Sequence, residues 1–263
     1  MTKRISMVLA VLGTAGLLSG CGTQPSAGCI VQDSSFANWI GKYTLVSGTG
    51  ACSTLKGESI GVWKYVDPTA TDAQRAAGTA AKLALRPRGA ANLMAATFRQ
   101  PGAAADSTVP RKNPAGENLA PQLATSLSET FADEPDAEGF CAAGNLSVQT
   151  IEAAQVVNSA GEPVATYPAA TVTYAYKNIE VYASPSAPGT QLRGNLTYTR
   201  DGCTAEYEVW GMWPAVGCSP GSTDPATSCG EGSTINPDFA VTCDPDLKAC
   251  VPARRPPSFS VEL

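Results

Sequence analysis

The sequence contains no histidine among its 263 residues. Ser-His-Asp triads, Cys-His dyads and histidine-based metal hydrolysis all depend on an imidazole, so these classes of enzyme are excluded. The nucleophile-elbow pattern Gly-Glu-Ser-Ile-Gly at 57–61 therefore has no base to take the proton of Ser59. The residues that follow it are also β-like, where an elbow needs a helix.

Two further catalytic patterns are incomplete. Ser53-Thr-Leu-Lys56 matches S-x-x-K, in which lysine is the base, but the companion S-x-N and K-[ST]-G elements are missing from the sequence. Glu206 and Glu208 alternate with apolar residues, which is typical of the solvated face of a strand. We predict no catalytic residue, and a hydrolase that uses carboxylates alone is the remaining enzymatic hypothesis.

Basic residues are fewer than acidic ones, 18 against 23, and the formal net charge is −5. An acidic chain is a poor partner for nucleic acid or for anionic lipid headgroups. The short run Gly48-Thr-Gly50 lacks the continuation of a phosphate-binding loop. The sequence therefore predicts no nucleic-acid partner and no cofactor.

No two of the nine cysteines have C-x-x-C spacing, and without histidine a zinc site would need thiolates alone, so we predict no metal. Setting Cys21 aside leaves an even set, which predicts four disulfides in an oxidising compartment. We expect pairs 29–52 and 229–243, with residue 141 bonded into the C-terminal half. The disulfide candidates are Cys29, Cys52, Cys141, Cys203, Cys218, Cys229, Cys243 and Cys250.

The N-terminus has the features of a secretory signal: Lys3 and Arg4, then an apolar run of small residues. Its end, Leu18-Ser-Gly-Cys21, resembles the lipobox of bacterial lipoproteins. The resemblance implies that residues 1–20 are cleaved, that Cys21 receives a diacylglyceryl thioether, and that its new amine is acylated. Residues 21–28 would then be the acylated cysteine and its tether. Several acyl chains hold a protein stably on a bilayer.

β-Structure is predicted in two regions of the globular chain. Residues 29–67 form an N-terminal β segment, in which "NWIGKYTLVSG" and "SIGVWKYV" are strands bounded by glycine. Residues 141–218 form an antiparallel region with strands in "ATVTYAYKNIEVYAS" and in the two runs around Asp201-Gly202. That dipeptide between alternating runs is the strongest hairpin signal in the sequence.

Two segments have a different composition. Residues 68–140 are rich in Ala and Pro and are predicted to be helical or irregular, with helices in "DAQRAAGTAAKLALR" (where "KLALR" also alternates like a strand) and "QLATSLSETF". The acidic run "ADEPDAEGF" is predicted to be a solvated loop. Residues 219–263 form a cysteine-rich irregular segment with too little aliphatic content for a core of its own.

These elements predict a mainly β fold, an antiparallel sandwich or barrel with a Pro/Ala-rich insertion and a disulfide-braced C-terminal loop region. The lipobox, "DGCTAEYEVWGMWPAVGC" and "NPDFAVTCDPDLKAC" together resemble secreted lipoproteins of myxobacteria. With Gly22 and Thr23 rather than Asp after the cysteine, the resemblance implies the outer membrane.

Two non-enzymatic functions remain open. The first is a membrane-anchored lipoprotein that contacts another envelope protein or a surface ligand. The second is a carrier of small apolar ligands in a barrel lumen. A closed apolar barrel would favour the carrier, and a cleft with two carboxylates about 5–10 Å apart would favour the hydrolase.

Overall fold

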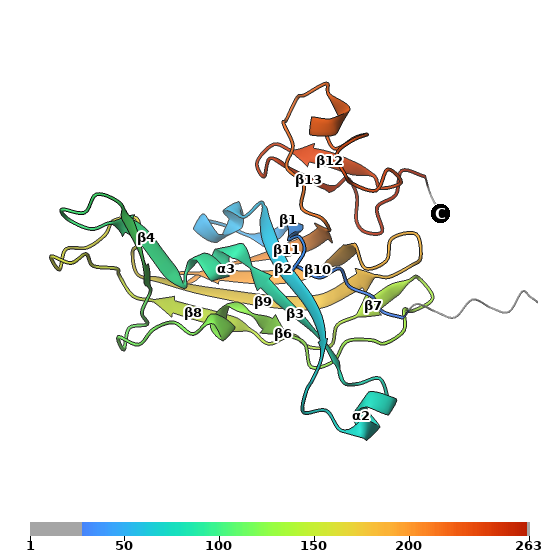
Figure 1. Ribbon diagram of the computed structural model, residues 1–263, viewed down its shortest axis with the longest axis horizontal. Helices are drawn as coiled ribbons and strands as arrows, with labels where there is room; N and C mark the ends of the chain where they lie inside the picture. The colour runs from blue at the N-terminus through green and yellow to red at the C-terminus, as the bar shows by residue number, and fades with distance from the viewer. Residues whose placement is uncertain (1–27, 262–263) are drawn as a thin grey trace, which may run out of the picture.

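The computed structural model describes residues 28–261, so Cys21 and the rest of the N-terminal signal lie outside the described residues. Its main feature is a nine-stranded antiparallel sheet that curves into a half-barrel (Figure 1). The strand order is β6-β3-β2-β1-β11-β10-β9-β7, and β8 also pairs with β9. The fold is therefore mainly β, as predicted.

The sheet contains β1 (Trp39–Gly48), β2 (Gly57–Val66), β3 (Ala81–Pro87), β6 (Ser126–Leu127), β7 (Phe140–Ala142), β8 (Gln149–Ala153), β9 (Ala170–Tyr182), β10 (Gln191–Arg200) and β11 (Cys203–Met212). Two hairpins lie outside it, β4 (Ala95–Arg99) with β5 (Asp106–Pro110), and β12 (Val241–Asp244) with β13 (Ala249–Pro252). The short helices are α2 (Asp72–Ala76), α3 (Arg88–Asn92), η1 (Ala51–Thr54), η2 (Pro121–Ala124) and η3 (Pro225–Thr227).

The β10–β11 hairpin forms where Asp201-Gly202 predicts it. Both residues have positive φ, 49° and 83°, which a two-residue type I′ turn requires. The register then pairs Arg200 with Cys203 and continues without interruption to Gln191 opposite Met212. Alternate residues such as Leu196 and Tyr198 are buried, so the local turn fixes which face of the hairpin meets the core.

The core lies on the concave face of the sheet and is rich in aromatic rings. Trp39, Tyr43, Tyr174, Tyr176 and Tyr207 are all at most 3% exposed. Burial decreases along β2, where Trp63 is half-buried and Tyr65 is 37% exposed near the end of the strand.

The Ala/Pro-rich segment contributes more to the sheet than its composition suggests. A helix does begin after Thr71, whose side chain forms a capping box with Gln74, but it ends at Ala76. Residues 81–87 then form β3, which pairs with β2 and buries Leu83 and Leu85. The second predicted helix, in "QLATSLSETF", is absent: η2 and the two-residue strand β6 occupy it. Burial against the sheet overrides the helical propensity of these residues.

A second buried cluster holds the C-terminal segment against the sheet. It includes Phe239 and Phe259 from this segment together with Tyr182 and Met212 from the ends of β9 and β11. Phe259 contacts Phe239 and Tyr182 edge-on, with ring centroids 5.5 and 5.8 Å apart. The segment therefore shares a core with the ends of the main strands, and Figure 1 shows it stacked above them.

All eight cysteines of the described chain are bonded, but the pairs differ from those predicted. The disulfides are Cys29–Cys141, Cys52–Cys203, Cys218–Cys243 and Cys229–Cys250. The expected pairs 29–52 and 229–243 are wrong, as is a bond from residue 141 to the C-terminal half. Proximity in sequence misled the prediction, because β1 pairs with β11 and so brings the loop after β1 beside the start of β11.

Candidate functional site

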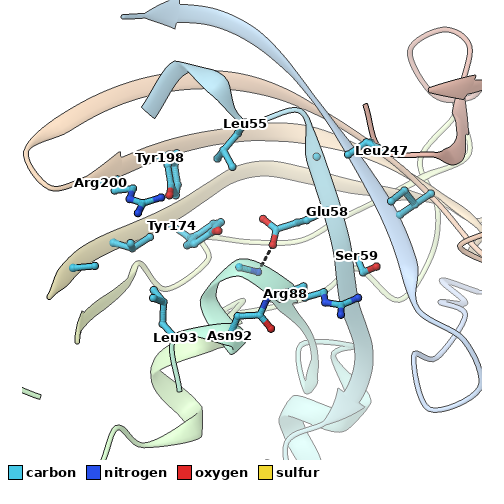
Figure 2. A pocket seen from close by; sticks show the side chains of 15 residues that line it. Leu55, Glu58, Ser59, Arg88, Asn92, Leu93, Tyr174, Tyr198, Arg200 and Leu247 are labelled. Atoms are coloured by element: carbon cyan, nitrogen blue, oxygen red, sulfur yellow. Dashed lines mark hydrogen bonds between the residues drawn. The ribbon is translucent and has the colours of Figure 1, made fainter. Parts of the chain in front are cut away.

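The candidate site is a cavity of about 480 Å³ on the concave side of the half-barrel (Figure 2). Strands β2, β9 and β10 and the short helix α3 supply most of its wall. Apolar side chains such as Leu55, Leu93 and Val172 line its sides, and Arg88 and Arg200 stand exposed at its edge. The cavity thus combines an apolar wall with a polar floor.

Glu58 provides the carboxyl group of that floor. Its Oε1 accepts a hydrogen bond from the Tyr43 hydroxyl at 3.1 Å, and its Oε2 accepts one from the backbone N–H of Gly89. The Tyr174 hydroxyl donates a third. Among the described residues that line the cavity, Glu58 is the one with a carboxyl group.

Gly89 at the start of α3 makes this close approach possible. A Cβ atom at this position would lie 2.5 Å from the Tyr174 hydroxyl oxygen and 3.0 Å from Glu58 Oε2. The first distance is too short for a Cβ contact and the second is tight, which favours glycine where the backbone touches the carboxylate. Figure 2 shows α3 directly opposite Glu58, with the hydrogen bond crossing the gap.

Tyrosines extend the hydrogen bonds of Glu58 into the core. The hydroxyls of Tyr43 and Tyr176 are 2.9 Å apart, and the rings of Tyr174 and Tyr198 meet edge-on at 5.1 Å. Burial raises the pKa of Tyr43 and of Tyr176 well above 10, and the nearby Glu58 charge raises each pKa further. These hydroxyls therefore stay protonated and act as donors.

Two opposing effects act on the pKa of the Glu58 carboxyl group. Burial raises the pKa of Glu58 above 4.5, while the hydrogen bonds from Gly89, Tyr43 and Tyr174 lower it and offset part of that rise. A carboxyl group in this setting holds or releases a proton nearer to neutral pH than an exposed glutamate does. Chemically, the floor can accept hydrogen bonds or pair with a cation.

The serines of the sequence motifs lie on either side of this residue. Ser53 is in η1 and donates to the Gly50 carbonyl at 2.8 Å, while Lys56 is exposed. Ser59 lines the cavity and belongs to strand β2, in the run predicted to be a strand.

Sequence reasoning missed Glu58, the middle of the same motif. A signal was available, because Glu58 has the same parity in β2 as the buried Ile60 and Val62 and so points inward. An acidic residue on the buried face of a strand is unusual and marks a candidate site.

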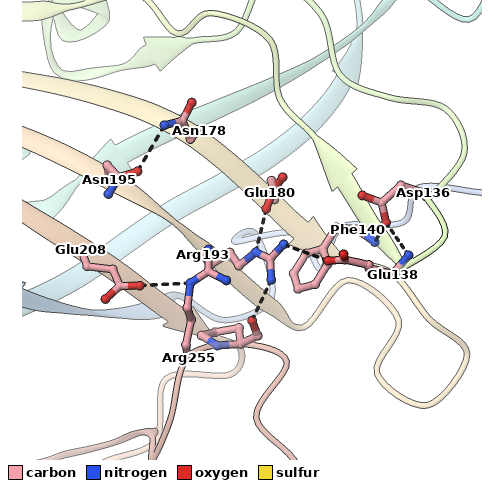
Figure 3. A network of polar contacts seen from close by, with 10 residues as sticks. Asp136, Glu138, Phe140, Asn178, Glu180, Arg193, Asn195, Glu208 and Arg255 are labelled. Atoms are coloured by element: carbon pink, nitrogen blue, oxygen red, sulfur yellow. Dashed lines mark hydrogen bonds and ion pairs between the residues drawn. The ribbon is translucent and has the colours of Figure 1, made fainter. Parts of the chain in front are cut away.

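The other acidic residues singled out in the sequence are structural. Glu208 forms an ion pair on the outer face, with its Oε1 3.1 Å from Arg255 Nε, as expected for the solvated face of a strand (Figure 3). Nearby, Arg193 pairs with Glu180 at 2.7 Å and lies over the Phe140 ring, 3.6 Å from its centroid. These contacts join β7, β9, β10 and β11 to the C-terminal segment across the outside of the sheet.

The acidic loops are turns. Asp136 Oδ1 accepts from two backbone N–H groups of the run "ADEPDAEGF", and Asp244 Oδ1 does the same for residues 246 and 247.

The sulfur atoms of Cys218, Cys229 and Cys243 lie within 4.8 Å of one another. All three belong to disulfides and offer no thiolate to a metal.

Comparison with known proteins gives two matches. A family model described as MlpA matches residues 37–214, which span the main sheet and every residue of the cavity lining except Leu247. The chain is also 36% identical over 273 residues to a protein of Myxococcus xanthus named "Putative lipoprotein MlpA", with 98% of this chain and all of that protein covered. No solved structure matches. Within residues 28–261, every helix is too short or too polar to cross a membrane.

Proposed function

The chain belongs to the MlpA family, and on that premise we propose that it is an acyl-anchored lipoprotein of the outer membrane that binds a small ligand in its half-barrel. The observation that carries the binding role is the cavity around Glu58. Its floor is a carboxyl group held by three donors, and its wall is apolar, which is the composition of a small-molecule site.

The anchoring part of the proposal rests on the lipobox and on the relative from Myxococcus xanthus. Cys21 takes the acyl chains, and residues 22–27 connect it to the globular part. Gly22 and Thr23 favour the outer membrane over the inner one. Another envelope protein or a surface ligand is the partner that such a position offers.

The alternatives fit this cavity less well. A purely apolar ligand would displace water from the carboxyl group of Glu58 and offer it no polar contact in return, which costs binding free energy. A hydrolase with paired carboxylates needs a second carboxyl group about 5–10 Å away. Among the described residues of the cavity wall, Glu58 is the single carboxyl group, and no second one accompanies it. Binding without chemistry is therefore the function that the site supports best.

Native mass spectrometry of the protein extracted from membranes tests the binding role. Asn92 is exposed at the cavity edge, so Asn92→Trp fills the entrance without disturbing the core. Asn195→Trp places the same ring on the opposite face of β10 and serves as the matched control. We expect a bound small molecule on the wild type and the control, and a bare chain for Asn92→Trp. The same bound mass on all three proteins, or on none, contradicts the proposal.

Intact-mass analysis tests the anchor separately. We expect three acyl chains on Cys21 and no alkylatable thiol, with the protein in the outer-membrane fraction of a density gradient. Cys21→Ala should leave the membrane fraction. A water-soluble wild-type product that begins at another residue contradicts the anchor, whatever the cavity binds.

A further inference from the structure

A second site is indicated by a buried arginine beside the end of β8 and the start of β9. Arg111 follows β5 and is 3% exposed. Its Nη2 donates to the carbonyl oxygens of Ala154 at 2.9 Å and Pro168 at 2.6 Å, and its guanidinium lies over the Tyr167 ring. These contacts join the β4–β5 hairpin to the chain after β8.

Among residues 28–261, no counter-ion is paired with the charge of Arg111. Its Nε is buried without a hydrogen-bond partner, and no carboxylate within residues 28–261 forms an ion pair with it. Both of its hydrogen bonds come from one nitrogen. A structural brace between two carbonyl groups needs only a neutral donor, whereas a buried cation without an anion is costly. The guanidinium therefore has unused capacity for an anion.

Arg111 also lines a separate cavity of about 340 Å³. Lys112 lines the same cavity, is exposed, and has no ion pair among the described residues. No Asp or Glu is among the described residues of its wall, although acidic residues outnumber basic ones in the chain. Val109, Val156 and Val157 supply an apolar side.

We propose that this cavity, the Arg111 site, binds a small organic anion, a carboxylate or a phosphate monoester with a short apolar part. The head group pairs with Arg111 and Lys112, because charge-assisted bonds to a guanidinium are the strongest that this wall offers. The apolar part lies against the valines. The site shares no residue with the Glu58 cavity and does not depend on the function proposed for it.

The test compares butyrate with butylammonium, which have four carbon atoms each and opposite charge. Binding to the full-length protein in zwitterionic detergent micelles is followed by saturation-transfer NMR of the ligand. We expect butyrate to bind, more weakly as salt rises, and butylammonium not to bind at this site. Arg111→Met should weaken butyrate binding by about tenfold or more. Lys112→Gln should weaken it by about two- to fivefold.

Controls separate this site from other effects. Lys56→Gln removes an exposed lysine that lines neither cavity, and Asn92→Trp fills the Glu58 cavity; both should bind butyrate as the wild type does. Arg111→Met also removes the hydrogen bonds to the carbonyl groups of Ala154 and Pro168. If Arg111→Met fails to fold, the result for Lys112→Gln decides the test. Because the Glu58 cavity can pair with a cation, the two ligands are compared in Asn92→Trp. Equal binding of both ligands by that variant, loss of its butyrate binding, or unchanged butyrate binding by Lys112→Gln would overturn the proposal.

Discussion

Removing one hydroxyl group, in Tyr43→Phe, tests the description of the cavity floor. The Tyr43 hydroxyl contacts Glu58 Oε1 at 3.1 Å and the Tyr176 hydroxyl at 2.9 Å, and its ring is 3% exposed. Phenylalanine keeps the ring and its packing. The variant therefore removes the link between the carboxyl group and the buried tyrosines and leaves the rest of the core in place.

The magnitude follows from the two bonds. A hydrogen bond to an ionised group contributes about 1.5–3 kcal/mol and one between neutral groups about 0.5–1.5 kcal/mol. Tyr43→Phe should therefore lower the free energy of unfolding by about 2–4 kcal/mol at pH 7. For a chain of this size that corresponds to a fall in Tm of about 5–15 °C. Loss of a donor also raises the pKa of Glu58 further.

Urea denaturation at several pH values measures both effects. The difference between wild type and variant should shrink as the pH falls through the raised pKa of Glu58, because a protonated carboxyl group accepts a weaker bond. Tyr65→Phe is the matched control: Tyr65 is 37% exposed, and the variant should change the free energy of unfolding by less than about 0.5 kcal/mol. A loss in Tyr43→Phe no larger than in this control, or one independent of pH, would refute the reasoning.

Three further predictions concern Gly89, the Cys52–Cys203 disulfide and Glu58. Gly89→Ala should destabilise by about 1–3 kcal/mol in urea, because its Cβ would meet a tyrosine hydroxyl at 2.5 Å, whereas Gly217→Ala, with no neighbour closer than 3.8 Å, should cost much less; equal losses would contradict this. Replacing both Cys52 and Cys203 by Ala opens a loop of 151 residues and should cost up to about 5 kcal/mol of unfolding free energy, so an unchanged urea midpoint would be contrary evidence. Glu58→Gln tests pH linkage: the folded-state pKa of this acid lies above 4.5, so the wild type gains stability as the pH falls through that pKa toward 4.5, and the variant should lack this gain. Parallel stability curves for wild type and Glu58→Gln would show that the carboxyl group is not buried as described.

Local features of the fold were predictable from the sequence, and features that depend on pairing between distant segments of the chain were not. The Asp201-Gly202 hairpin follows from the φ angles that its two turn residues tolerate. By contrast, "KLALR" satisfies both a helical and an alternating pattern, and only pairing with β2 selects the strand. The disulfides follow the same rule, since Cys52 and Cys203 become neighbours through the pairing of β1 with β11.

The candidate sites show the same limit. Glu58 could be placed on the inward face of β2 from parity, but the donors that hold it come from β1, β9 and α3. Arg111 gave no signal in sequence, because one arginine in a Pro-rich stretch reads as solvated. Its burial depends on carbonyl groups more than forty residues away. Such sites are assembled by topology rather than by spacing.

The position of the first disulfide determines how a tethered protein carries tension. The described chain begins at Gly28, and the next residue is bonded covalently to Cys141 in β7. Lys64 in β2 also holds the Cys29 carbonyl at 2.7 Å. A force applied to the chain before Gly28 is therefore transmitted through the Cys29–Cys141 disulfide to β7 and β9. Strand β1, in the middle of the sheet, is not the first to detach. With the N-terminal anchor that we propose, a force from the surroundings would leave the shape of the half-barrel and its cavity unchanged.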